Sequence, residues 1–94
     1  MARTLTYAKH VSFKNFSSFT YVVNELDEQA YLLEGTAALI WKEIGNGGSV
    51  LDVYNRSHNA VSELGDTNYV LAQEDFASFC RSMLLSGLIE ELVL

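Results

Sequence analysis

The spacing of apolar positions divides the chain into two halves. In the first half apolar and polar residues alternate, which is typical of half-buried β-strands. Val11 and Phe13 alternate with polar neighbours, and a stretch rich in aromatic and β-branched residues follows. The pattern predicts strands at about 9–14, 19–25 and 29–33. Since the links between them are short, we expect an antiparallel meander with the second strand in the centre.

From Gly35 onward the apolar residues recur at helical spacing, so the second half predicts amphipathic helices. Gly45 to Gly48 form a glycine-rich turn after the first helix, because glycine permits the left-handed conformations of a helix end. Ser49 can cap the next helix, with Asp52 near the positive end of its dipole. The predicted helices cover about 35–44, 50–64 and 68–86, and 88–94 is expected to form a short extended tail.

These elements predict an α+β fold in which a three-stranded antiparallel sheet is followed by three helices. A chain of 94 residues fits a single domain, so we expect residues 1–94 to share one core. Hydrophobic residues make up 49% of the chain, which argues against disorder.

The charge of the chain disfavours nucleic acid as a partner. Twelve acidic and six basic residues give a net charge of −6, whereas binding a phosphate polymer needs a basic surface. Three helices after a small sheet also suit a helix-turn-helix protein. The third helix, however, carries Arg81 as its single base, close to Glu74 and Asp75, and a reader of the major groove presents several basic groups. We therefore expect no nucleic-acid partner.

The basic residues are unevenly distributed. Arg3, Lys9 and Lys14 lie in a first segment without any acid. Two interpretations stay open from the sequence: an arm that meets an acidic partner, or an edge strand whose lysines prevent aggregation.

No pattern of a catalytic or metal site is found in the sequence. Cys80 is the single cysteine, and His10 and His58 have no second ligand at metal-binding spacing. Adjacent carboxylates, as at Glu74 and Asp75, point apart on a helix and do not form an acid/base pair. We expect a non-catalytic protein without cofactor or metal. No apolar run is long enough to span a bilayer and the start has no signal-peptide pattern, so we expect a cytoplasmic protein.

Two features suggest a binding function. The third strand, at 29–33, leaves an open edge to which an extended peptide can add. The third helix has an apolar stripe wider than a small sheet needs, so part of it can line a groove; the alternative is that the other helices cover all of it.

Three segments in order resemble the PqqD-like family. The segment 31–41 (Tyr-Leu-Leu-Glu-Gly-Thr-Ala-Ala-Leu-Ile-Trp) resembles its strand-to-helix signature, and Ser49, opening a helix, fits its next segment. The segment 75–79 (Asp-Phe-Ala-Ser-Phe), followed by Met83 and by Gly-Leu-Ile at 87–89, is similar to its closing helix. The resemblance implies a winged helix-turn-helix-like domain, a stand-alone recognition element for ribosomally synthesised, post-translationally modified peptides.

In such families the leader of a precursor peptide adds as a strand beside the third strand and packs against the third helix. A separate maturase, often a radical S-adenosylmethionine enzyme, then modifies the peptide. Tyr31 is the best candidate for an anchor, since aromatic residues dominate binding hot spots. The candidate leader-binding residues are Gln29, Ala30, Tyr31, Leu32, Leu33, Ala72, Asp75, Phe76, Phe79, Ser82 and Met83.

A second class of function stays open. The same scaffold suits a general protein-interaction or transcriptional winged-helix module without a precursor-peptide ligand. An open strand edge also pairs with copies of itself, so we expect a monomer or a weak homodimer.

Overall fold

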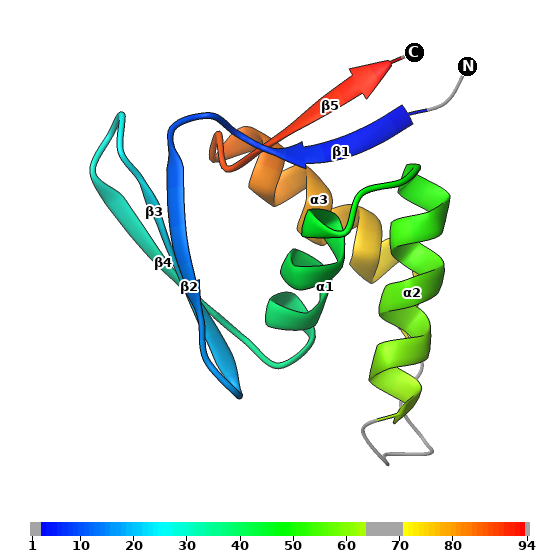
Figure 1. Ribbon diagram of the computed structural model, residues 1–94. Helices are drawn as coiled ribbons and strands as arrows, with labels where there is room; N and C mark the ends of the chain where they lie inside the picture. Colours follow the sequence, from blue (N-terminus) through cyan, green and yellow to red (C-terminus); the bar gives the residue numbers. More distant parts are fainter. Residues whose placement is uncertain (1–2, 64–70, 94) are drawn as a thin grey trace.

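The computed structural model describes residues 3–63 and 71–93, and in these the fold is α+β (Figure 1). Small antiparallel sheets pack with three helices. The elements in chain order are β1 (Arg3–Tyr7), β2 (Val11–Asn15), β3 (Phe19–Asn24), β4 (Gln29–Glu34), α1 (Thr36–Gly45), α2 (Val50–Glu63), α3 (Gln73–Leu85) and β5 (Ile89–Val93).

The predicted meander is confirmed. β2, β3 and β4 form an antiparallel sheet with β3 in the centre, and Val22 of β3 lies opposite both Phe13 of β2 and Tyr31 of β4. The side chain of Val22 is fully buried. The turn between β3 and β4 is closed by side-chain oxygens, since Asn24 accepts from the Leu26 N–H and Asp27 from the Gln29 N–H, each at 3.0 Å.

The predicted architecture was incomplete, because the helices do not all follow the strands. β1 and β5 pair antiparallel, from Arg3 opposite Val93 to Tyr7 opposite Ile89, and form a second sheet beside the helices (Figure 1). The acid-free start is therefore not a free arm. Arg3 lies in β1 and forms an ion pair with Glu91 of β5 at 3.3 Å.

The helix boundaries follow local capping. Gly35 precedes α1 with φ of 58°, a left-handed conformation that glycine adopts without steric cost. At the start of α2 the Asp52 N–H donates to Ser49 Oγ at 3.1 Å and the Ser49 N–H donates to Asp52 Oδ2 at 3.2 Å, so the predicted cap is confirmed as a reciprocal capping box.

The third helix begins later than expected. Ala72 is extended (φ −69°, ψ 145°), so α3 begins at Gln73. The predicted start at 68 lies outside the described residues. The helix ends at Leu85, one residue before the predicted end.

One core joins both sheets and all three helices. Its buried apolar side chains come from β1, β3, β4, the helices and β5: Leu5, Val22, Leu33, Ala38, Ile40, Trp41, Ile44, Val53, Val61, Leu71, Phe76, Cys80, Met83, Leu88 and Ile89. The centre of this core is Trp41 of α1, which is fully buried.

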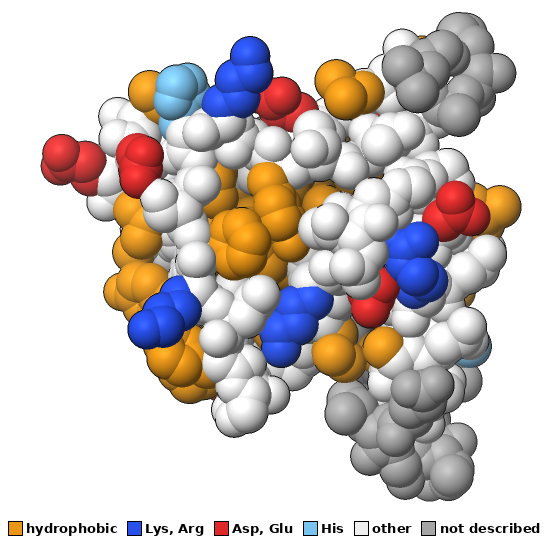
Figure 2. Space-filling view, viewed as in Figure 1, with side chains coloured by type: hydrophobic (Ala, Val, Ile, Leu, Met, Phe, Trp, Pro, Cys, Tyr) orange, Lys and Arg blue, Asp and Glu red, His pale blue; other side chains and the backbone are white. Residues whose placement is uncertain are grey.

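An aromatic cluster connects the two sheets. Tyr7 of β1 stacks on Trp41 with ring centroids 4.4 Å apart, and Phe13 of β2 contacts both rings at 4.7 and 5.5 Å. The Tyr7 hydroxyl donates to the Trp41 carbonyl at 2.5 Å. Figure 2 shows hydrophobic side chains gathered in a hollow between β2 and α1. The cluster fixes the strands against the first helix, since aromatic pairs add to the free energy of burial.

Arg56 of α2 holds the end of α1. Its guanidinium donates to Glu43 Oε2 and to the carbonyls of Glu43 and Gly47, at 3.0, 3.0 and 2.5 Å. The Glu43 carbonyl lies in the last turn of α1 and the Gly47 carbonyl in the loop that follows, so the arginine ties the two together and complements the helix dipole.

Candidate functional site

The outer edge of β4 is open among the described residues. β4 pairs with β3 on one side and with no other described strand. The C-terminal strand, which could have filled this edge, pairs with β1 instead. Alternate backbone groups along β4 are therefore available to a further strand.

The two faces of β4 differ in what they contact. Tyr31 is half-buried and packs on the core, and Leu33 next to it on the same face is buried. Leu32 projects from the opposite face and is 52% exposed, and Ala30 beside it is exposed. Gln29 is exposed at the start of the strand. Of the β4 candidates on the core side, Tyr31 and Gln29 are thus accessible to a ligand.

The candidates on α3 also divide by burial. Phe76 and Met83 are 4% and 7% exposed, so their side chains belong to the core. Phe79 is half-buried and packs at the margin of the core, while Asp75 and Ser82 are exposed. Spacings of four and three residues put Asp75, Phe79 and Ser82 on one flank of the helix.

Two observations limit the predicted set. Leu33, Phe76 and Met83 are core residues, so they offer little surface to a ligand on β4. Ala72 lies before α3 in extended backbone rather than on its surface. The helical stripe is therefore largely covered by the other elements, and the part that a ligand on β4 could contact is limited to the flank with Phe79.

A buried amide fixes the β3–β4 hairpin against α3. Asn24, at the end of β3, is 6% exposed, and its Nδ2 donates to the carbonyl of Ser86 at 3.2 Å. Its Oδ1 accepts from the Leu26 N–H in the turn. Because Ser86 directly follows α3, this one side chain sets the position of the hairpin relative to the helix.

The surroundings of the β4 edge are acidic. Glu28 directly precedes the strand, Glu34 is its last residue, and Asp75 lies on the accessible flank of α3; all three are exposed. The ion pairs found among the described residues, Arg3 with Glu91 and Arg56 with Glu43, do not involve them. This edge therefore favours a ligand that carries lysine or arginine.

The three-stranded sheet has a second open edge, which was not among the binding sites predicted from the sequence. β2 pairs with β3 on one side and with no other described strand. On its core side β2 carries Phe13, whose ring packs against the rings of Tyr7 and Trp41. The signal was present in the sequence, since a three-stranded meander always has two edges, and the experiment proposed below distinguishes them.

Among the described residues, four cavities have walls that include no residue of β4. Strand addition does not need an enclosed pocket, because it takes its affinity from backbone hydrogen bonds.

The titratable groups of the core have ordinary structural roles. Burial, and secondarily the charge of Glu91, raises the pKa of the Cys80 thiol to about 11, so the thiol is neutral at neutral pH. Over 3–63 and 71–93, no three His, Cys, Asp or Glu side chains gather closely enough to hold a metal ion. None of the helices in those ranges has the length and apolar character needed to cross a membrane.

Comparison of the chain with family models, with curated proteins and with solved structures found no match.

Proposed function

We propose that the chain is a winged-helix-like peptide-recognition domain of the PqqD-like type, which binds the leader of a precursor peptide as an added strand on β4. It presents the peptide to a separate maturase, which in families of this type is often a radical S-adenosylmethionine enzyme. The open edge of β4 carries this proposal.

The contacts around the edge support it. Backbone pairing along β4 supplies register and most of the affinity, while Tyr31 and Phe79 offer apolar surface to alternate residues of the leader. Both side chains are half-buried, so they are held in place before the ligand arrives, which lowers the entropy cost of binding.

Tethering is the mechanism by which binding assists the reaction. A leader held on β4 keeps the core peptide close to the maturase, and the local concentration rises to the millimolar range for a short linker. The domain itself needs no reactive group for this role. The acidic surroundings at Glu28, Glu34 and Asp75 favour a leader with basic residues.

The proposal predicts that a short precursor peptide is encoded next to this chain's gene, and the test uses a labelled synthetic peptide with the leader sequence of that precursor. Titration should give saturable binding that weakens with added salt. Amide hydrogen exchange should then show new protection along β4 and in the peptide. Protection along β2 instead, or no binding, would contradict the proposal.

Side-chain variants locate the face that is used. Tyr31→Ala and Phe79→Ala should each lower the affinity for the peptide about tenfold, since a buried aromatic contact contributes roughly 1–2 kcal/mol. Leu32→Ala is the matched control, because Leu32 lies on the same strand but projects from the opposite face. Equal losses for Leu32→Ala and Tyr31→Ala would contradict a ligand lying between β4 and α3.

Proline variants test the backbone. In an edge strand alternate N–H groups point outward, and proline is tolerated only where the N–H faces solvent. Of Tyr31→Pro and Leu32→Pro, the variant that stays folded has therefore lost an outward N–H, and it should bind the leader at least tenfold more weakly. Unchanged affinity in that folded variant would exclude strand addition at this point.

A further inference from the structure

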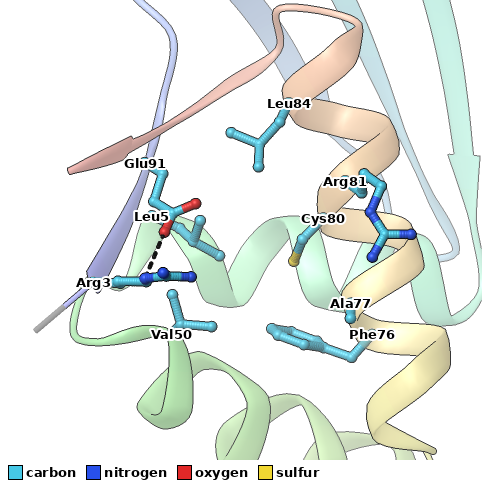
Figure 3. A pocket seen from close by; sticks show the side chains of 9 residues that line it. All are labelled: Arg3, Leu5, Val50, Phe76, Ala77, Cys80, Arg81, Leu84 and Glu91. Carbon is cyan, nitrogen blue, oxygen red and sulfur yellow. Dashed lines mark ion pairs between the residues drawn. The ribbon is translucent and has the colours of Figure 1, made fainter. Parts of the chain in front are cut away.

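A cavity of about 300 Å³ opens on the other flank of α3, away from β4. It lies between α3, the start of α2 and the β1–β5 sheet (Figure 3). In this view α3 separates the cavity from the strands of the three-stranded sheet. Its lining residues are Arg3, Leu5, Val50, Phe76, Ala77, Cys80, Arg81, Leu84 and Glu91.

The floor of this cavity is apolar. Leu5 and Val50 face Phe76, Cys80 and Leu84 across the cavity in Figure 3. The three residues of α3 recur at intervals of four, so they form a single stripe along the helix. Cys80 adds to the apolar wall, since burial keeps its thiol protonated.

The apolar surface continues past the cavity. A second cavity of about 350 Å³ is lined by Val50, Leu51, Tyr54, Gln73 and Phe76. Val50 and Phe76 line both cavities, so the two adjoin along the line where α2 meets α3. Leu51, on the wall of the second cavity, is 63% exposed. Each cavity lies within or near the range of about 300–1,000 Å³ that small-ligand sites occupy.

Two arginines border the first cavity from opposite sides, Arg3 on β1 and Arg81 on α3 (Figure 3). The chain has three arginines, and two of them, Arg3 and Arg81, line this one site although the net charge of the protein is −6. The third, Arg56, is engaged with α1. Arg81 is exposed and forms no ion pair with a described residue.

The one acid at the mouth is already neutralised. Glu91 pairs with Arg3 at 3.3 Å, which leaves the charge of Arg81 uncompensated. The Arg3 side chain is 71% exposed, so this pair is loose and solvent-screened and can rearrange when an anion arrives. An apolar floor below a surplus of positive charge is complementary to a ligand with an aliphatic body and an acidic head.

We infer that this site binds an amphipathic anion, whose flexible aliphatic chain enters between α2 and α3 and whose carboxylate or phosphate head meets the exposed Arg81, while Arg3 borders the opposite side of the cavity (Figure 3). The Arg81 guanidinium binds either head group in a bidentate manner. The alkyl chain displaces water from the apolar walls, which supplies most of the binding free energy. The site shares Phe76 with the candidate peptide site but lies on the opposite flank of α3, so it stands independently of the proposed function.

The experiment is a nuclear magnetic resonance titration of the isotope-labelled protein with decanoate and, separately, with decyl phosphate. Saturable shifts should appear at Leu5, Val50 and Ala77, and not along β4. Decanol and decyltrimethylammonium have the same chain without the negative charge, and both should bind at least tenfold more weakly.

Variants with matched controls test both halves of the site. Arg81→Glu should lower the affinity for decanoate about tenfold or more. Lys14→Glu makes the same charge change on β2 and should change this affinity by less than about twofold. Ala77→Leu should fill the opening of the cavity and lower the affinity for both anions. Ser78→Leu changes the neighbouring residue, which does not line the cavity, and should leave both affinities unchanged. Equal affinity for decanol and decanoate, insensitivity to Arg81→Glu, or no shifts at millimolar ligand would each overturn the inference.

Discussion

The hydroxyl of Tyr7 lies directly against the backbone of Gly45, at the last residue of α1. A methyl group at position 45 would stand 2.5 Å from Tyr7 Oη and 3.1 Å from two ring carbons. Position 45 thus requires glycine for lack of space, and this close approach lets the tyrosine cover the end of the helix and reach the Trp41 carbonyl.

Gly45→Ala should lower the free energy of unfolding by about 1–3 kcal/mol, because overpacking outweighs the gain of up to about 1 kcal/mol in helix propensity. Denaturant unfolding measures the loss. Adding Tyr7→Phe removes the nearest atom, so the double variant should lose less than the sum of the two single losses. Strict additivity would show that the two residues are not in contact.

The stability of the protein should fall in alkali. Burial, with a smaller contribution from Glu43, raises the pKa of Tyr7 to about 12, while the backbone of Gly45 acts in the opposite direction. Above pH ~10 the unfolded chain loses this proton and the folded chain keeps it, so unfolding is favoured progressively up to pH ~12. We expect a loss of roughly 1–2 kcal/mol from this group.

Urea unfolding at a series of pH values checks this, and near-ultraviolet absorbance follows tyrosinate formation. Tyr7→Phe is the control variant. It should be less stable at neutral pH, having lost a hydrogen bond, but it should lose less stability than the parent between pH ~10 and ~12. An unchanged alkaline slope in Tyr7→Phe would assign the effect to other groups.

Asn24→Ala should destabilise the protein by about 1–3 kcal/mol, because the Ser86 carbonyl and the Leu26 N–H both lose their partner. Thermal unfolding gives the size of the effect. If the leader binds between β4 and α3, the folded fraction of Asn24→Ala should also bind the leader more weakly, because the β3–β4 hairpin is no longer held against α3. Asn55→Ala, at an exposed position of α2, is the control and should have little effect.

Glu28→Gly should raise the free energy of unfolding by roughly 0.5–1 kcal/mol. Glu28 has φ of 60° in the β3–β4 turn, a conformation that costs an L-residue energy and glycine very little. Leu26→Gly, in the same turn but at negative φ, should instead be destabilising. Equal signs for the two variants would refute the conformational origin of the effect.

Much of the fold could be predicted because local patterns encode it. The meander, the capping box at Ser49 and Asp52 and the apolar stripes of the helices all depend on residues close in the sequence. β1 was missed since its partner, β5, lies at the far end of the chain, and periodicity carries no information on such a pairing. Leu5 and Tyr7 alternating with threonines were the available signal.

The orientation of β3 shows a second limit. Thr20 and Asn24 face the core while Tyr21 is 46% exposed, the reverse of what residue type favours. Tertiary hydrogen bonds, from Thr20 to Asn15 and from Asn24 to Ser86, make this possible. On α3, Phe76 and Met83 lie in the core while Phe79 lies at its margin, which the sequence pattern does not distinguish because all three belong to one apolar stripe.

The pairing of Arg3 with Val93 also has a topological consequence. The first and last described residues, Arg3 and Val93, lie side by side at the outer end of the β1–β5 sheet (Figure 1). Such an arrangement suits splicing of the whole unit into a surface loop of a host protein, or circular permutation through a short new linker. Either fusion would leave the strand edge facing outward.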